Sequence, residues 1–206
     1  MTWIFGYGSI IWRPDFPYAE RREGWVVDHT RRFWQGSPDH RGTPSQLGRV
    51  VTLVPSEGEI CWGVAYRLHL EHEDEVMAYL DHRERGGYVR FDVDFTTAVT
   101  PAGTLLQDST AGDIVRAITY IASPTNDYYL GPVAHPQMVA QISRARGESG
   151  KNADYVLNLA KGLLEMGLRD AHVEGLAASL KEVAAKEDVA TTVGAPTPLE
   201  TAKVVA

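Results

Sequence analysis

The sequence predicts an α+β protein in which a small mixed β-barrel, or a rolled sheet, is flanked by helices. Two observations lead to this prediction. Hydrophobic residues recur with a period of about two over residues 3–122, and with a helical period over residues 136–187. A run of strands followed by a run of helices is typical of α+β folds.

The expected strands begin with the opening apolar run, which leads into a glycine-rich turn. Further strands are expected at residues 49–54, 61–68, 89–95 and 114–121. In one of them Val89, Phe91, Val93 and Phe95 alternate with charged residues, which predicts a half-buried antiparallel strand.

One helix is expected between the strands, at residues 71–83, with Val76, Met77 and Leu80 on its buried face. The pair Gly86-Gly87 is a stop signal after it. Apolar stripes predict further helices after residue 136: Met138/Ile142, Tyr155/Leu159/Leu163 and Val173/Leu176/Leu180. We therefore expect a single domain at residues 1–187, followed by a flexible, non-periodic tail at residues 188–206.

The composition is that of an ordinary globular protein, with 206 residues, 44% of them hydrophobic and 23% charged. The net charge of −7 argues against nucleic acid as a partner. The single cysteine excludes an internal disulfide framework, and neither a membrane helix nor a signal peptide is apparent. The expectation is a cytoplasmic protein, by default a monomer, without membrane partners.

The opening run ends in a loop that suits ligand binding. Gly6 and Gly8 flank Tyr7, and Ser9 follows. Glycine permits a close backbone approach that a Cβ would block, so main-chain N–H groups can surround a ligand. A tight turn at the end of a strand has the same composition, and the loop alone does not decide between the two.

Glu84 is the candidate acid or base. It lies at the end of the expected helix, where the helix dipole disfavours a carboxylate. The acidic cluster at residues 71–75 is interpreted as a solvated helix face instead. One carboxylate beside a main-chain cradle is enough for proton transfer on a small amide.

Other kinds of site are disfavoured. A dinucleotide site would require a third glycine where Ile11 stands. His69 and His72 lack further metal ligands, and the remaining histidines, including His40, are interpreted as ordinary surface or structural residues. Cys61 lies in an apolar strand and is expected to be a buried hydrophobic residue rather than a nucleophile.

Several motifs, taken together and in order, resemble those of the ChaC-type gamma-glutamylcyclotransferases, which act on glutathione. The resemblance covers nearly the whole chain up to about residue 186. The motifs are Phe5-Gly6-Tyr7-Gly8-Ser9-Ile10-Ile11-Trp12, Arg31-Arg32-Phe33-Trp34-Gln35-Gly36-Ser37 with Asp39-His40-Arg41-Gly42-Thr43-Pro44, Gly48-Arg49-Val50-Val51-Thr52-Leu53, Tyr79-Leu80-Asp81 through Glu84 to Gly87-Tyr88, Tyr129-Leu130-Gly131-Pro132, and Ser149-Gly150-Lys151-Asn152 with Tyr155.

The resemblance implies a gamma-glutamylcyclotransferase-like fold and the cleavage of glutathione to 5-oxoproline and cysteinylglycine, without a metal or another cofactor. It implies that Glu84 is the catalytic general acid and base. The substrate-binding residues that it implies are Tyr7, Gly8, Ser9, Ile10, Arg41, Tyr129 and Tyr155.

This chemistry is physically sensible, because the substrate's own α-amine attacks its γ-carbonyl and the nucleophile is already tethered. Two alternatives stay open from the sequence. One is a cyclotransferase for other gamma-glutamyl amino acids or amines, and the other is a non-catalytic gamma-glutamyl-binding protein.

Overall fold

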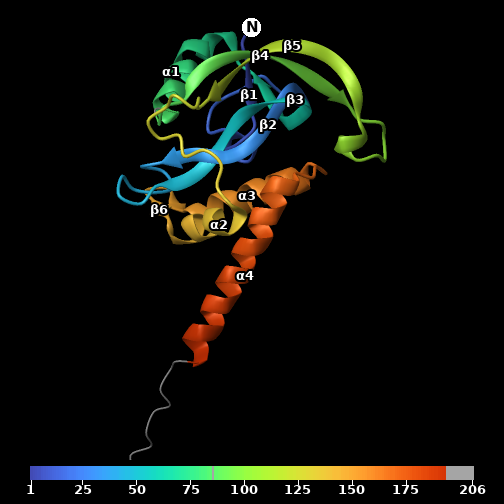
Figure 1. Cartoon of the computed structure of the whole chain (residues 1–206). Coiled ribbons are helices and arrows are strands. Elements are labelled where there is room, and N and C mark those ends of the chain that lie inside the picture. Colours follow the sequence, from blue (N-terminus) through green and yellow to red (C-terminus); the bar gives the residue numbers. More distant parts are fainter. Residues whose placement is uncertain (85, 194–206) are drawn as a thin grey trace, which may run out of the picture.

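The computed structural model describes residues 1–84 and 86–193, and it contains a closed five-stranded barrel with helices packed around it (Figure 1). The strand order is β1-β3-β2-β4-β5. The strands are β1 (Trp3–Gly6), β2 (Glu20–Ser37), β3 (Gly48–Arg67), β4 (Val89–Val99) and β5 (Thr110–Ile121). The expected α+β class and the mixed barrel are thus confirmed.

Barrel closure depends on one parallel contact in an otherwise antiparallel sheet. β1 pairs with β3 along its length and meets β5 at the single pair Ile4↔Ile118. β2 and β3 form a long antiparallel hairpin that starts near Glu20↔Arg67 and ends at Ser37↔Gly48. The far end of this hairpin carries the loop between residues 37 and 48 beyond the barrel, where it becomes part of the site described below.

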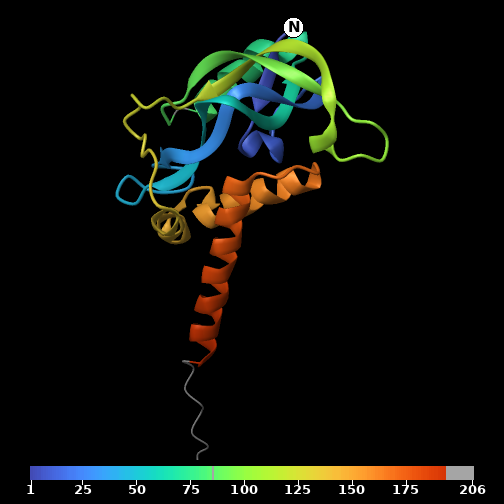
Figure 2. The same ribbon diagram turned by 45° about the vertical axis from the view of Figure 1, so that its right-hand side comes forward.

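The helices lie on two sides of the barrel. α1 (Glu73–Arg83) follows the 3₁₀ turn η2 (Leu70–His72) and packs beside β4 and β5, whereas the remaining helices gather at the other side (Figures 1 and 2). Those are α2 (His135–Arg144), α3 (Asn152–Glu165) and α4 (Ala171–Val193), with the short hairpin β6 (Arg146–Gly147) and β7 (Gly150–Lys151) between α2 and α3. Two further 3₁₀ turns are η1 (Ser9–Ile11) and η3 (Leu106–Asp108).

One hydrophobic core joins the barrel interior to the helices. The buried residues include the predicted faces of all four helices, among them Val76, Met77 and Leu80 of α1. On the helical side the stripes from the sequence are also buried: Met138, Ile142, Tyr155, Leu159, Leu163, Val173, Leu176 and Leu180.

Four local expectations differ from the structure. The expected strands did not include residues 20–37, which form β2, and the strands expected at residues 49–54 and 61–68 are parts of one continuous strand, β3. Val93 and Phe95 are buried as expected, but Val89 and Phe91 are exposed, and they lie before residues 95–97, at which β4 pairs with β2. α4 continues to Val193 and projects away from the barrel, so the first residues of the expected tail are helical. Residues 194–206 lie outside the described residues.

Among the described residues, none of the helices is both long enough and apolar enough to cross a membrane.

Candidate active site

The glycine-rich loop between β1 and η1 needs small residues because side chains from other parts of the protein lie very close to it. A Cβ on Gly8 would lie 2.9 Å from the hydroxyl oxygen of Tyr155 and 3.0 Å from a methyl group of Val51. A Cβ on Gly6 would lie 2.9 Å from the Cβ of Ile10. Close contact, rather than a left-handed backbone, therefore explains both glycines; Gly8 itself has a φ of −120°.

The same loop presents the beginning of η1 to the interior. The N–H groups at the start of a helix have no acceptor within that helix, and in η1 these are the N–H groups of Ser9 and Ile10. The loop is held by two tyrosines: the Tyr66 hydroxyl donates to the Ile10 carbonyl at 3.0 Å, and the Tyr7 hydroxyl donates to the Tyr120 carbonyl at 2.6 Å.

Glu84 caps the carboxyl end of α1. Its N–H donates to the Leu80 carbonyl at 2.9 Å, and its own carbonyl accepts from the Tyr88 N–H at 3.3 Å. Gly87 has a φ of +88°, and a Cβ there would collide with the side chain of Asn126. The Gly86-Gly87 stop signal therefore acts as expected, and it turns the chain so that Glu84 faces inward.

The carboxyl group of Glu84 is largely withdrawn from solvent, with 19% of its side chain exposed. Burial raises its pKa above the ordinary value of 4.5. The Arg83 guanidinium, whose Nε lies 3.5 Å from a Glu84 carboxyl oxygen, and the nearby His40 act in the opposite direction, while Asp39 adds to the rise. A carboxyl group with a raised pKa is better suited to exchanging protons near neutral pH than an exposed one.

Arg83 connects Glu84 to the glycine-rich loop. One of its terminal nitrogens donates to the Ser9 hydroxyl at 2.7 Å, and the other donates to the carbonyls of Arg13 at 3.2 Å and Pro14 at 3.1 Å. Ser9 of the loop and Glu84 are more than 70 residues apart in sequence, and the Arg83 side chain contacts both.

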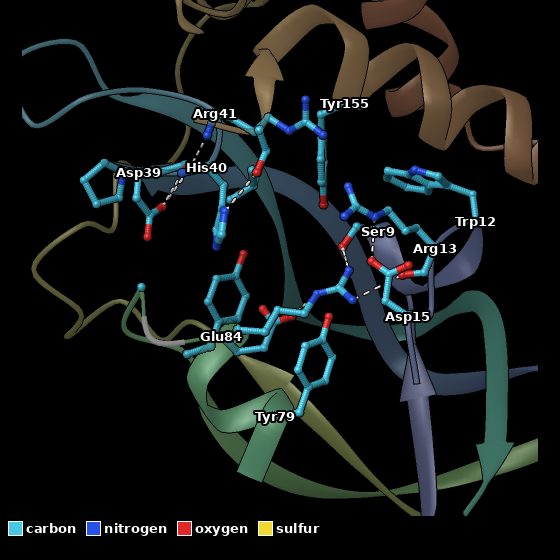
Figure 3. Close-up of a pocket in the computed structure, with 18 residues that line it drawn as sticks. Ser9, Trp12, Arg13, Asp15, Asp39, His40, Arg41, Tyr79, Glu84 and Tyr155 are labelled. Atoms are coloured by element: carbon cyan, nitrogen blue, oxygen red, sulfur yellow. Dashed lines mark hydrogen bonds and ion pairs between the residues drawn. The ribbon is translucent and has the colours of Figure 1, made fainter. Parts of the chain in front are cut away.

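Two adjoining cavities meet at Glu84. The inner cavity, of about 40 Å³, is lined by Phe5, Gly6, Tyr7, Gly8, Ser9, Ile10, Val51, Glu84, Tyr88, Thr119, Tyr120 and Tyr155. The outer cavity, of about 180 Å³, is lined by Ser9, Trp12, Arg13, Asp15, Gly36, Ser37, Pro38, Asp39, His40, Arg41, Val50, Tyr79, Arg83, Glu84, Gly86, Tyr88, Ser149 and Tyr155 (Figure 3). Ser9, Glu84, Tyr88 and Tyr155 line both.

The inner cavity contains a distinctive set of titratable groups. Besides Glu84 the described ones are four tyrosines, Tyr7, Tyr88, Tyr120 and Tyr155. Burial raises the pKa of each phenol above its ordinary value of 10, so all four are neutral at neutral pH. Among the described side chains of this cavity, Glu84 is therefore the one that can exchange a proton near neutral pH.

The rim of the outer cavity is formed by the loop after β2 and the β6–β7 hairpin. The N–H of Glu148 donates to the Asp39 carbonyl at 2.9 Å, and the N–H of Ser149 donates to the His40 carbonyl at 3.0 Å. Arg41 donates from its guanidinium to the Lys151 carbonyl at 3.1 Å. Its guanidinium carbon also lies 5.7 Å from the centre of the Tyr155 ring, which is the geometry of a cation–π contact.

The structure gathers all but one of the site residues that the sequence and its resemblance suggested. Tyr7, Gly8 and Ile10 line the inner cavity, Arg41 lines the outer one, and Ser9, Glu84 and Tyr155 line both. Tyr129 lines neither cavity as the described residues define them. Its backbone forms a bridge with Gln35, and its ring lies beside Gly131.

Several residues of the site did not stand out in the sequence. Arg83 adjoins Glu84, but a basic residue in the last turn of a helix is ordinary. His40 was interpreted as an unremarkable histidine, yet it lines the outer cavity beside Arg41. A signal for both existed in the motifs, since His40 and Arg83 lie within the segments that carry the family resemblance.

The structure also shows the residues of the metal site and of the cysteine nucleophile that the sequence disfavoured. His69 and His72 have ring centres 6.2 Å apart, and in the described parts of the chain no three His, Cys, Asp or Glu residues are placed to share an ion. Cys61 is 3% exposed, and burial raises the pKa of its thiol. Such a thiol is a poor nucleophile at neutral pH.

Comparison with known proteins gives a consistent result. A family model described as ChaC-like protein matches residues 2–183. Glutathione-specific gamma-glutamylcyclotransferase 1 of Mus musculus is 41% identical over 178 residues, which cover 84% of this chain and 75% of the mouse protein. Gamma-glutamylcyclotransferase 2-3 of Arabidopsis thaliana is 38% identical over 192 residues, which cover 90% of this chain and 92% of the plant protein.

Among solved structures, a gamma-glutamyl cyclotransferase specific to glutathione from yeast is similar to this chain with a TM-score of 0.79 and 26% identity. The match covers 88% of this chain and 96% of the yeast chain. The fold that the motifs implied is therefore confirmed.

Proposed function

The chain belongs to the ChaC-like protein family, and we propose that it is a glutathione-specific gamma-glutamylcyclotransferase, which converts glutathione to 5-oxoproline and cysteinylglycine. The observation that carries the proposal is Glu84, a buried carboxyl group with a raised pKa at the junction of two cavities. The names of the mouse and plant relatives and of the yeast structure support the choice of reaction.

In this proposal the gamma-glutamyl part of glutathione occupies the inner cavity. The N–H groups of the loop at Tyr7, Gly8, Ser9 and Ile10 bind its α-carboxylate or the oxyanion that develops on the γ-carbonyl. The leaving dipeptide then extends into the outer cavity, where Arg41 and Tyr155 border it. The scissile amide lies between the two, next to Glu84.

Glu84 serves as base and then as acid. An ammonium group cannot attack a carbonyl, so the carboxylate first removes a proton from the α-ammonium of the substrate. The amine nitrogen forms a bond to the carbon of the γ-carbonyl and closes the five-membered ring. Glu84 passes its proton to the leaving nitrogen, and the C–N bond to cysteinylglycine breaks as Glu84 takes the remaining extra proton from the ring nitrogen, so that the lactam is neutral. This second proton then passes to the released amine, and Glu84 returns to its ionised form. The raised pKa assists the first step by making the carboxylate a stronger base.

The test is to incubate the purified protein with glutathione and to measure 5-oxoproline and cysteinylglycine. Equal amounts of both products are expected, and their absence would overturn the proposal and leave the non-catalytic gamma-glutamyl-binding protein as the better interpretation. A panel of gamma-glutamyl amino acids and amines tests the specificity for glutathione. Comparable rates on that panel would favour the broader cyclotransferase.

We also propose that the protein acts as a cytoplasmic monomer that needs neither a metal nor another cofactor. Sedimentation analysis tests the monomer. Loss of activity after dialysis against EDTA, with recovery on addition of a divalent cation, would contradict metal independence.

A further inference from the structure

Arg13 presents a largely uncommitted guanidinium group to the outer cavity. Its side chain lines that cavity and is 62% exposed. Its Nε donates to a carboxylate oxygen of Asp15 at 2.5 Å, whereas its two terminal nitrogens make no hydrogen bond within the described parts of the chain. In Figure 3 the side chain points into the cavity. Because most of the side chain is exposed, an anion in the cavity can reach these nitrogens.

The backbone of Arg13 is fixed between the glycine-rich loop and α1. Its N–H donates to the Ser9 carbonyl at 2.9 Å, and its carbonyl accepts from a terminal nitrogen of Arg83 at 3.2 Å. Nε of Arg83 in turn lies 3.5 Å from a carboxyl oxygen of Glu84. One guanidinium group therefore separates the backbone of Arg13 from Glu84, and the fixed backbone keeps the Arg13 side chain at the outer cavity.

The other arginines described in the lining of the outer cavity are already engaged. Both terminal nitrogens of Arg83 donate to the loop and to the residues that follow it. Arg41 donates to the Lys151 carbonyl and lies against the Tyr155 ring. Burial lowers the pKa of Arg41, and the charge of Arg13 lowers it further, so the two guanidinium groups are close enough to repel each other. An anion bound at Arg13 would reduce that repulsion.

The described carboxylates of the outer cavity leave one edge of the Arg13 guanidinium open. Asp15 accepts from Nε, which leaves the edge formed by the two terminal nitrogens. Asp39 lies on the opposite side of the cavity in Figure 3, and Glu84 lies where the cavity meets the inner one. A further carboxylate can therefore bind the open edge through two parallel hydrogen bonds, an arrangement that is common for arginine.

The glycine carboxylate of glutathione is an anion of suitable position. In the proposed function the leaving dipeptide extends from Glu84 into the outer cavity, and two residues of extended chain span at most about 7 Å. Contacts of 3.5 and 3.2 Å link Glu84 to the Arg13 carbonyl through the Arg83 guanidinium. This separation is of the same order as the length of the dipeptide.

We infer that Arg13 is a specificity-determining residue, whose terminal nitrogens bind the C-terminal carboxylate of glutathione in the outer cavity. This inference rests on the proposed function. It adds to that function a means of distinguishing glutathione from gamma-glutamyl compounds that lack this carboxylate. Because the carboxylate is remote from the bonds that change, the interaction is equally strong in the ground state and in the transition state. It therefore lowers KM and leaves kcat unchanged.

A matched pair of substrates isolates the carboxylate: glutathione and its C-terminal amide, which differ in that group alone. For the wild-type protein kcat/KM is expected to be on the order of 10-fold higher for glutathione, through KM, as for one charge-assisted hydrogen bond at a partly exposed site. Added salt should reduce this preference, because it screens exposed charges. Arg13→Gln should lower kcat/KM for glutathione to that for the amide, with the rate on the amide unchanged.

Arg144→Gln is the matched control. Arg144 is exposed on α2 and lines neither cavity, and its substitution changes the net charge of the protein by the same amount. This variant should keep the wild-type preference for glutathione over the amide. Thermal melting confirms that both variants are folded.

Three results would overturn the inference and leave the proposed function intact. The first is equal kcat/KM of the wild-type protein on the two substrates, and the second is a preference for glutathione that survives in Arg13→Gln. The third is loss of that preference in Arg144→Gln as well, which would indicate a long-range effect of net charge. If instead the wild-type protein releases no 5-oxoproline from either substrate, the proposed function fails, and the inference fails with it.

Discussion

Glu84→Gln is the change that tests the site most directly. It keeps the shape of the side chain and removes the base, while the inner cavity offers no other described group that exchanges protons near neutral pH. We expect kcat to fall by about 10²- to 10⁴-fold, the usual contribution of general acid–base catalysis. What remains would come from holding the amine close to the γ-carbonyl.

The assay is 5-oxoproline release under saturating glutathione, with Glu75→Gln as control. Glu75 is exposed in the first turn of the same helix, so its substitution should leave kcat unchanged. Glu84→Asp keeps the charge but withdraws it by one methylene, and a displacement on the order of 1 Å can cost about 100-fold. A folded Glu84→Gln protein with near wild-type kcat would refute the assignment of Glu84.

The stability of the same variant provides an independent check. Because the pKa of Glu84 is raised in the folded state, the folded protein binds its proton more tightly than the unfolded chain does. Ionisation of Glu84 therefore reduces stability as pH rises through its folded pKa. Glu84→Gln should melt at a higher temperature than wild type at pH 7, and the difference should shrink below pH 4.5, the ordinary pKa. A variant that is less stable at pH 7 would contradict this account of the carboxyl group.

Three further predictions concern the positioning of the loop, the nucleophile and the fold. Arg83→Met should lower kcat and raise the KM for glutathione together, because it removes the hydrogen bond to Ser9 as well as the charge beside Glu84. Loss of that charge should raise the pKa of Glu84 and shift the acidic limb of the pH–rate profile to higher pH. An unchanged profile would argue against the role of Arg83. N-acetylated glutathione should release no 5-oxoproline, since its nitrogen is no longer a nucleophile, and liquid chromatography that detects free cysteinylglycine from this compound would point to hydrolysis instead. Asn152→Ala should lower the free energy of unfolding, measured by urea unfolding, by roughly 3 kcal/mol. The reason is that the buried N–H and carbonyl of Arg49 lose their hydrogen bonds to the Asn152 side chain, at 2.6 and 2.7 Å. A loss below about 1 kcal/mol would show that the structure around Arg49 relaxes.

Local patterns in the sequence were sufficient for most of the elements, although not for β2, and they marked Glu84 and the glycine-rich loop as candidates for the site, whose roles only the family resemblance specified. The change from a period of two to a helical period separated the barrel from the helices, and Val76, Met77 and Leu80 form the buried face of α1 as predicted. Glu84 was noticeable because the helix dipole disfavours a carboxylate at that end of a helix, and the loop because its glycines permit a close backbone approach. These are short-range properties, and short-range properties can be read from neighbouring residues.

Only the tertiary structure determined how these parts meet. The closure of the barrel through Ile4↔Ile118, and the contact of Arg83 with Ser9, depend on residues that are far apart in the chain. The burial that raises the pKa of Glu84 and the contact of the His40 imidazole with Ser149 also depend on residues that are far apart in the chain. The position of Tyr129, which lines neither cavity as the described residues define them, was likewise decided by the tertiary structure. Periodicity reports which face of an element is apolar, but the partner of that face is selected by packing of the whole chain, and the free energy of a charge depends on that packing.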